Sequence, residues 1–132
     1  MKTIYRLADD ANKVGLIQKA TLTTADYGIR QTHGLFGSPE WWRKIESGEL
    51  VRHTISGRIS SVYMAGMRDW PEFRVRLADG SEESFTREAN SIELAKEYEE
   101  GKKVEVDFVW QQHKKAFLGT PETRIILEIR TE

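Results

Sequence analysis

Apolar and polar residues alternate along five segments in the C-terminal two-thirds of the chain, the pattern of β-strands with one buried face. In the first segment Ile59 continues one apolar phase, and the phase switches at Ser60-Ser61 so that Val62 belongs to the other. A shift of this kind inside one strand is typical of a β-bulge, which bends the strand. The sequence therefore predicts a long, bent strand over residues 51–64.

The next four segments predict two strands, a short helix and two more strands. Asp79-Gly80 is a strong signal for a tight turn between strands over residues 72–77 and 82–87. Asn90 and Glu93 then resemble a capping box at the start of a helix, which Gly101 would end. The apolar positions of the last two strands are Val104, Val106, Phe108 and Trp110, and then Ile125, Leu127 and Ile129.

The first 50 residues predict an extension of strands and one helix. Residues 3–7 are expected to form a short strand, and residues 14–23 alternate at period two, which also favours a strand. Residues 39–47 are predicted to form a helix, since Ser38 can cap its first turn and Gly48 can end it. The apolar stripe of this helix consists of Trp41, Trp42 and Ile45.

Five strands with a helix between the third and fourth, and a long bent first strand, resemble the OB-fold, loosely in its S1-type form. The positions that carry this resemblance are Gly57, Ile59, Val62, Val75, Leu77, Asp79, Gly80, Gly101, Lys102 and Val104. The resemblance covers residues 51–131 and implies a mostly β, β-rich α+β fold built on a small five-stranded barrel. We expect one domain over residues 1–132, in which the extension of residues 1–50 packs on the barrel.

Composition and charge narrow the classes of function. The chain has 132 residues, 39% of them hydrophobic and 31% charged, as in an ordinary globular domain. It contains no cysteine, which excludes disulfides, thiolate zinc sites and cysteine nucleophiles. The net charge of −1 gives no whole-molecule attraction to nucleic acid or to a membrane. The N-terminal residues contain no apolar run typical of a signal peptide, and we therefore expect a cytoplasmic protein.

The sequence contains no catalytic or phosphate-binding motif, such as G-x-S-x-G or G-x-x-x-x-G-K-[ST]. The three histidines are scattered, without metal-ligand spacing on one element. We therefore expect no metal, no cofactor and no catalytic residue, and we favour a protein that is not an enzyme.

Two loops of the predicted barrel carry residue types that are common in binding sites. In OB-folds the loops between strands one and two and between strands four and five lie on the binding side, which here are residues 65–71 and 112–119. The candidate binding residues are Met67, Arg68, Trp70, His113, Lys114, Lys115 and Phe117. The alternative is structural: Trp70 would close one end of the barrel, Phe117 would cover its other side, and the two lysines would be solvated.

The favoured function is a non-catalytic binding module that uses these two loops to bind a protein partner or a second copy of itself. Met, Arg and Trp are enriched in protein interfaces. The first alternative is single-stranded nucleic acid, which also requires cations and flat aromatic rings. After Asp79-Gly80 the chain continues Ser81-Glu82-Glu83, which differs from the S1 pattern, and so nucleic acid ranks second. A small-ligand barrel or an enzyme of unrecognised type completes the alternatives.

Overall fold

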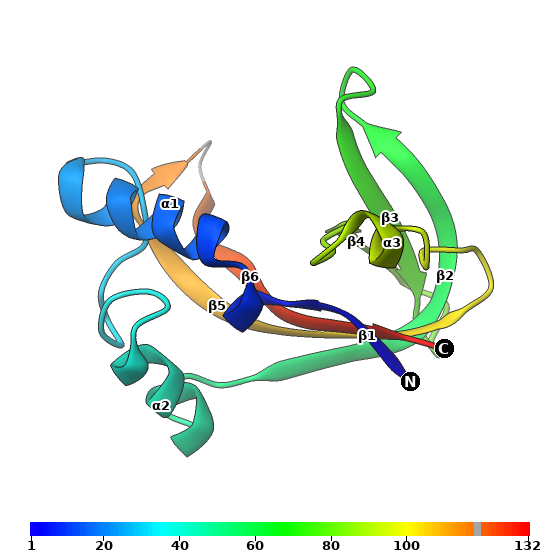
Figure 1. Ribbon diagram of the computed structural model, residues 1–132, viewed down its shortest axis with the longest axis horizontal. Coiled ribbons are helices and arrows are strands. Elements are labelled where there is room, and N and C mark those ends of the chain that lie inside the picture. The colour runs from blue at the N-terminus through cyan, green and yellow to red at the C-terminus, as the bar shows by residue number, and fades with distance from the viewer. Residues whose placement is uncertain (118–119) are drawn as a thin grey trace. The chain divides into compact units, whose positions relative to one another are not determined.

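The computed structural model describes residues 1–117 and 120–132 and is mostly β, which confirms the predicted fold class. Its six strands form one sheet with the order β1-β6-β5-β2-β3-β4 (Figure 1). The helices and strands are β1 (Lys2–Arg6), α1 (Ala11–Thr23), α2 (Pro39–Ser47), β2 (His53–Ala65), β3 (Trp70–Arg76), β4 (Glu82–Thr86), α3 (Ile92–Ala95), β5 (Lys103–Phe117) and β6 (Thr120–Thr131).

The five predicted barrel strands correspond to β2–β6, and α3 lies between β4 and β5 as predicted. The sheet has a sixth strand, however, because β1 pairs antiparallel with β6. Ile4 and Tyr5 of β1 are completely buried, and this burial holds the strand in the sheet. In the strand order β1 and β4 are consequently the two edges of the sheet.

The predicted strand over residues 14–23 is wrong, because these residues belong to helix α1. The side chain of Asp10 caps the helix by accepting a hydrogen bond from the backbone N–H of Lys13. The apolar residues of the period-two pattern do not mark a buried face, since Leu16 and Leu22 are 62% and 63% exposed. Only Thr21 is buried in this helix, and its hydroxyl donates to the carbonyl of Ile17.

Two local predictions are confirmed. The register of β2 against β3 shifts between Ile59 and Ser61, as a bulge requires. Helix α2 spans Pro39–Ser47, where Ser38 accepts a hydrogen bond from an N–H of the first turn and Gly48 has a φ of 84°.

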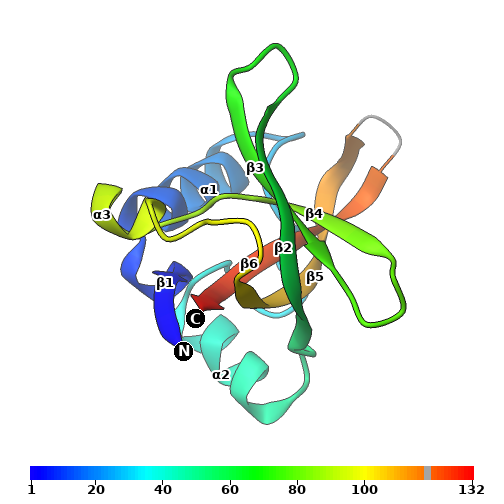
Figure 2. The same ribbon diagram turned by 90° about the vertical axis from the view of Figure 1, so that its right-hand side faces the viewer.

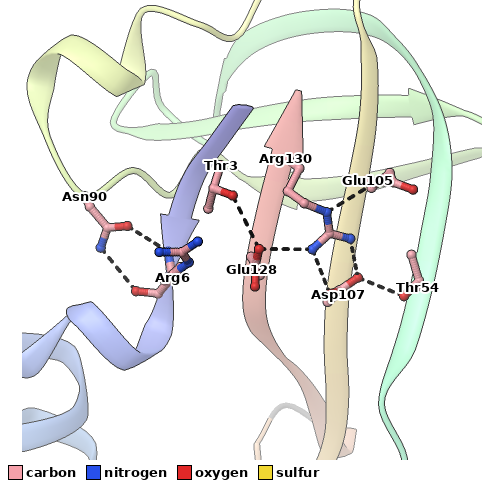
Figure 3. Close-up of polar contacts among 8 residues, drawn as sticks. All are labelled: Thr3, Arg6, Thr54, Asn90, Glu105, Asp107, Glu128 and Arg130. Carbon is pink, nitrogen blue, oxygen red and sulfur yellow. Dashed lines mark hydrogen bonds and ion pairs between the residues drawn. The ribbon is translucent and has the colours of Figure 1, made fainter. Parts of the chain in front are cut away.

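Asn90 does not cap the next helix as predicted, because Ser91 takes that position and accepts from the N–H of Leu94. Asn90 binds strand β1 instead. Its backbone N–H donates to the carbonyl of Ile4 at 3.1 Å. Its side-chain amide accepts from the N–H of Arg6 at 2.7 Å and donates to the carbonyl of Arg6 at 3.1 Å (Figure 3). The side-chain amide thus substitutes for a peptide group and ties the segment after β4 to the edge strand β1.

The chain forms two compact units, and strands β2, β5 and β6 contribute to both. The first unit contains residues 1–6, 54–107 and 128–132, and the second contains residues 7–53 and 108–127. The largest completely or almost completely buried side chains of the first unit are Tyr5, Phe73, Ile4, Ile59 and Ile129, and those of the second are Trp41, Phe36, Leu7 and Val109. The predicted arrangement as one domain with an extension over residues 1–50 stays a prediction.

In the part of the chain that the structure describes, no helix is both long enough and apolar enough to cross a lipid bilayer.

Candidate protein-binding surface

The turn between β2 and β3 is shorter than the predicted loop over residues 65–71. Ala65 is the last residue of β2 and pairs with Trp70, the first residue of β3, so that residues 66–69 alone form the turn. Both Gly66 and Arg68 have positive φ, at 63° and 67°. We refer to residues 64–70 as the hairpin tip. In Figure 1 the hairpin of β2 and β3 extends well beyond β4 and α3, which belong to the same unit.

The hairpin tip exposes large apolar side chains. Met67 is 94% exposed, Trp70 56% and Met64 44%. The alternative in which Trp70 closes the end of a barrel is therefore wrong, because more than half of its surface faces solvent. Its indole Nε1–H donates to the hydroxyl of Thr86 at 3.0 Å, which fixes the orientation of the ring.

Side-chain contacts join the strands below the hairpin tip. The hydroxyl of Tyr63 donates to the carboxylate of Glu72 at 2.8 Å, and the guanidinium of Arg74 lies 4.7 Å from the centroid of the Tyr63 ring. Arg87 donates to the carbonyl of Tyr63 at 3.0 Å. Figure 2 shows β2 and β3 as a twisted two-stranded ribbon up to the turn. A partner that binds the tip would therefore meet a surface that is ordered before contact, which lowers the entropic cost of binding.

The predicted loop over residues 112–119 is largely wrong, since β5 continues to Phe117 and β6 starts at Thr120. An irregular segment of residues 28–30 pairs with this part of β5. The N–H of Arg30 donates to the carbonyl of Gln112 at 2.8 Å, and the N–H of Lys114 donates to the carbonyl of Gly28 at 3.2 Å. The side chain of Phe117, together with Leu118 and Gly119, lies outside the part of the chain that the structure describes.

The ammonium of Lys114 is engaged inside its own unit. It donates to the carbonyl of Thr24 at 2.8 Å and to that of Thr21, both at the C-terminal end of α1. A cation at this end of a helix satisfies free carbonyls and interacts favourably with the helix dipole. Lys115 is exposed and lies 3.9 Å from the carboxylate of Asp26, and His113 is half-buried. The structure thus gives Lys114 a structural task that a solvated lysine would not have.

The structure brings Met67, Arg68 and Trp70 together on the hairpin tip of the first unit. His113, Lys114 and Lys115 belong to the second unit. The two predicted groups therefore lie in different units.

A charged cluster around Arg130 was not singled out from the sequence. The guanidinium forms a bidentate pair with Asp107, at 2.8 and 2.9 Å, and also contacts Glu105 at 3.2 Å and Glu128 at 3.3 Å (Figure 3). Thr54 donates to Asp107 at 2.8 Å. The pKa of Arg130 is raised above its usual value, mainly by the hydrogen bond to Asp107. Because the Asp107 side chain is only 5% exposed and is paired with Arg130, the cluster presents no free charge at this position.

A second group of aromatic residues lies on β2, β5 and β6 in the second unit. His53 stacks on Phe108 with a centroid distance of 5.3 Å, and Trp110 meets the edge of Phe108 at 5.9 Å. The guanidinium of Arg124 lies 5.4 Å from the centroid of Phe108 and 5.9 Å from that of Trp110. Trp110 is 42% exposed, although the sequence pattern places it on the buried face of its strand.

The first unit also contains an open groove of about 690 Å³ between β2, the end of β3 and β5. Ile59, Leu77 and Val104 supply apolar surface, and Arg58 and Arg76 supply charge. These two arginines lie 3.8 Å from Glu132 and 3.4 Å from Glu82, which reduces the positive charge of the groove. Within residues 1–117 and 120–132 no three His, Cys, Asp or Glu side chains are arranged to hold a metal ion.

Comparison with known protein families identifies the chain. A family described as immunity protein RhsI2 matches residues 1–131, and the chain therefore belongs to this family. A comparison with curated proteins finds no match. Immunity proteins act by binding a partner toxin protein, so the predicted binding of a protein partner is confirmed at this level.

Proposed function

We propose that this member of the RhsI2 immunity family binds its cognate toxin through the hairpin tip, residues 64–70, and thereby prevents the toxin from acting. Neutralisation by binding requires a complementary surface and no catalytic residue. The proposal makes the predicted binding residues Met67, Arg68 and Trp70 the centre of the contact.

The exposure of Met67 and Trp70 is the observation that carries this proposal. Both side chains extend from a two-stranded ribbon, at 94% and 56% exposure. Isolated apolar side chains on a surface need no explanation, but a methionine, an arginine and a tryptophan within four residues form a concentration of the types that dominate interface energetics. The hydrogen bond from Trp70 to Thr86 holds the ring in place before the partner arrives.

Residues 112–119, which were also predicted to contact the partner, have a smaller role in the proposed contact. His113 and Lys115 stay candidates for direct contact, whereas Lys114 contributes through the position of α1. A cytoplasmic location, self-association and nucleic-acid binding stay predictions.

Titration calorimetry tests the proposal, with the purified chain and its cognate toxin carrying a substitution that abolishes toxicity. Trp70→Ala should weaken binding at least 30-fold, since a central tryptophan commonly contributes about 2 kcal/mol or more to an interface. Trp110→Ala is the matched control, because Trp110 is also partly exposed but lies in the other unit. Urea melts of both variants establish that they fold.

Weakening confined to Trp70→Ala would support the hairpin tip as the binding surface. Weakening confined to Trp110→Ala would overturn the proposal in favour of the aromatic group on β5.

A further inference from the structure

The backbone of Arg68 has a conformation that arginine disfavours. Its φ is 67°, and it is the one non-glycine residue with positive φ in the described part of the chain. In this left-handed region the Cβ atom crowds the following carbonyl, and hairpin turns therefore normally place glycine or asparagine there. Gly66, two residues earlier in the same turn, also has a positive φ, and there the chain does have a glycine. The chain thus has an arginine where glycine would fold with less strain.

Among the described residues, the Arg68 side chain finds no polar partner that would offset this cost. It is exposed, and within residues 1–117 and 120–132 it has no hydrogen bond or ion pair. Other arginines of the same unit are engaged: Arg74 lies over the ring of Tyr63, and Arg87 donates to a backbone carbonyl. Folding therefore does not explain the strain at Arg68, and strained residues of this kind cluster at functional sites.

We propose that Arg68 determines partner specificity by forming an ion pair with a carboxylate group of the toxin. This inference rests on the proposed function and adds the chemistry of the partner surface. A guanidinium recognises a carboxylate through two parallel hydrogen bonds. Met67 and Trp70 would exclude water around the pair, which strengthens it. The partner surface should accordingly have an Asp or Glu at the rim of an apolar depression.

Arg68→Gly should lose affinity without losing stability. The variant relieves the turn, and its urea midpoint should be equal to or higher than that of the wild type. Its affinity for the inactivated cognate toxin should fall at least tenfold. Arg68→Lys keeps the charge without the planar fork, so that its affinity should lie between the two. Arg43→Gln is the control for a general loss of positive charge, because Arg43 is exposed on α2, and its affinity should match the wild type.

Unchanged affinity in Arg68→Gly would overturn the inference. If Trp70→Ala still weakens binding in that case, the proposed function stands without this ion pair. If neither variant weakens binding, both fail. A lower urea midpoint in Arg68→Gly would also overturn it, because Arg68 would then stabilise the folded chain.

A charge exchange completes the test. Arg68→Glu should bind at least tenfold more weakly, and one Asp→Lys or Glu→Lys substitution in the toxin should restore binding to Arg68→Glu. If no such substitution at any exposed Asp or Glu of the toxin restores binding to Arg68→Glu, the inference is overturned. Salt-sensitive binding of single-stranded oligonucleotides that is lost in Arg68→Gly would instead indicate phosphate as the ligand and would also overturn it.

Discussion

Met67→Ala should weaken binding with little effect on folding. Complete burial of a methionine side chain is worth about 1.5–3 kcal/mol. Because Met67 is 94% exposed in the free protein, almost all of this free energy is still available to a partner and almost none stabilises the fold. After subtraction of the methyl group that alanine retains, we expect a loss of about 1–2 kcal/mol in binding, which corresponds to about 5–30-fold in Kd. The free energy of unfolding should stay within about 0.5 kcal/mol of the wild type.

The assay has two parts that use the same protein preparations. Calorimetric titration with inactivated toxin gives the ratio of Kd values, and urea melts followed by tryptophan fluorescence give the free energy of unfolding. Leu22→Ala is a suitable control, since Leu22 is also largely exposed, at 63%, but lies on α1 in the other unit. Equal affinity of Met67→Ala and the wild type would refute the reasoning, and so would a loss of stability as large as the loss of binding.

Three further predictions concern the scaffold. Arg130→Met should lower the free energy of unfolding by about 3 kcal/mol, since it removes the guanidinium that pairs with the buried Asp107, and an unchanged urea midpoint would contradict this role. Lys114→Met should cost about 1.5 kcal/mol through the lost contacts with the end of α1, and an unchanged urea midpoint would contradict the capping role. Burial raises the pKa of the Tyr98 phenol above its usual value of about 10, so the unfolded state loses this proton first and stability should fall as the pH rises above about 10. In Tyr98→Phe this part of the fall in stability at alkaline pH should disappear. The variant also loses the hydrogen bond to the carbonyl of Glu88, and this loss is the same at every pH. An identical fall in both proteins would contradict the role of the Tyr98 phenol.

Local sequence signals predicted those elements whose cause is local. The helix over Pro39–Ser47 has its cap, its first-turn proline and its terminal glycine within the segment. The bulge near Ser60 is a change of phase within one strand. The tight turn at Asp79-Gly80 depends on two adjacent residues, and Gly80 has the positive φ that this turn requires.

Elements that depend on distant partners were not predictable in the same way. Residues 14–23 alternate like a strand, but they form α1, and Lys114, 90 residues after Thr24 in the sequence, donates to the carbonyl of Thr24 at the end of this helix. Asn90 carries a side chain suited to a helix cap, yet the backbone of Arg6, 84 residues away in the sequence, offers two hydrogen bonds instead. Residues 112–117 belong to β5, and residues 28–30 pair with this part of the strand, although no sequence pattern connects the two segments.

The candidate site shows the same division. The composition of residues 65–71 indicated an exposed surface of interface-type side chains, and the structure confirms the exposure of Met67 and Trp70. The strain at Arg68 could not be predicted, since a φ of 67° at an arginine contradicts its usual preference. The contact of Lys114 with α1 could not be predicted either, because the alternation of residues 14–23 favoured a strand in place of this helix.

Amide hydrogen exchange of the chain, free and bound to its inactivated cognate toxin, tests the location of the binding surface most directly. We predict that the slowing of exchange on binding is largest at the amides of residues 64–70, with smaller changes elsewhere. Slowing that is confined to other segments, such as the aromatic group around Phe108 and Trp110, with residues 64–70 exchanging as fast as in the free chain, would contradict the proposed mode of binding.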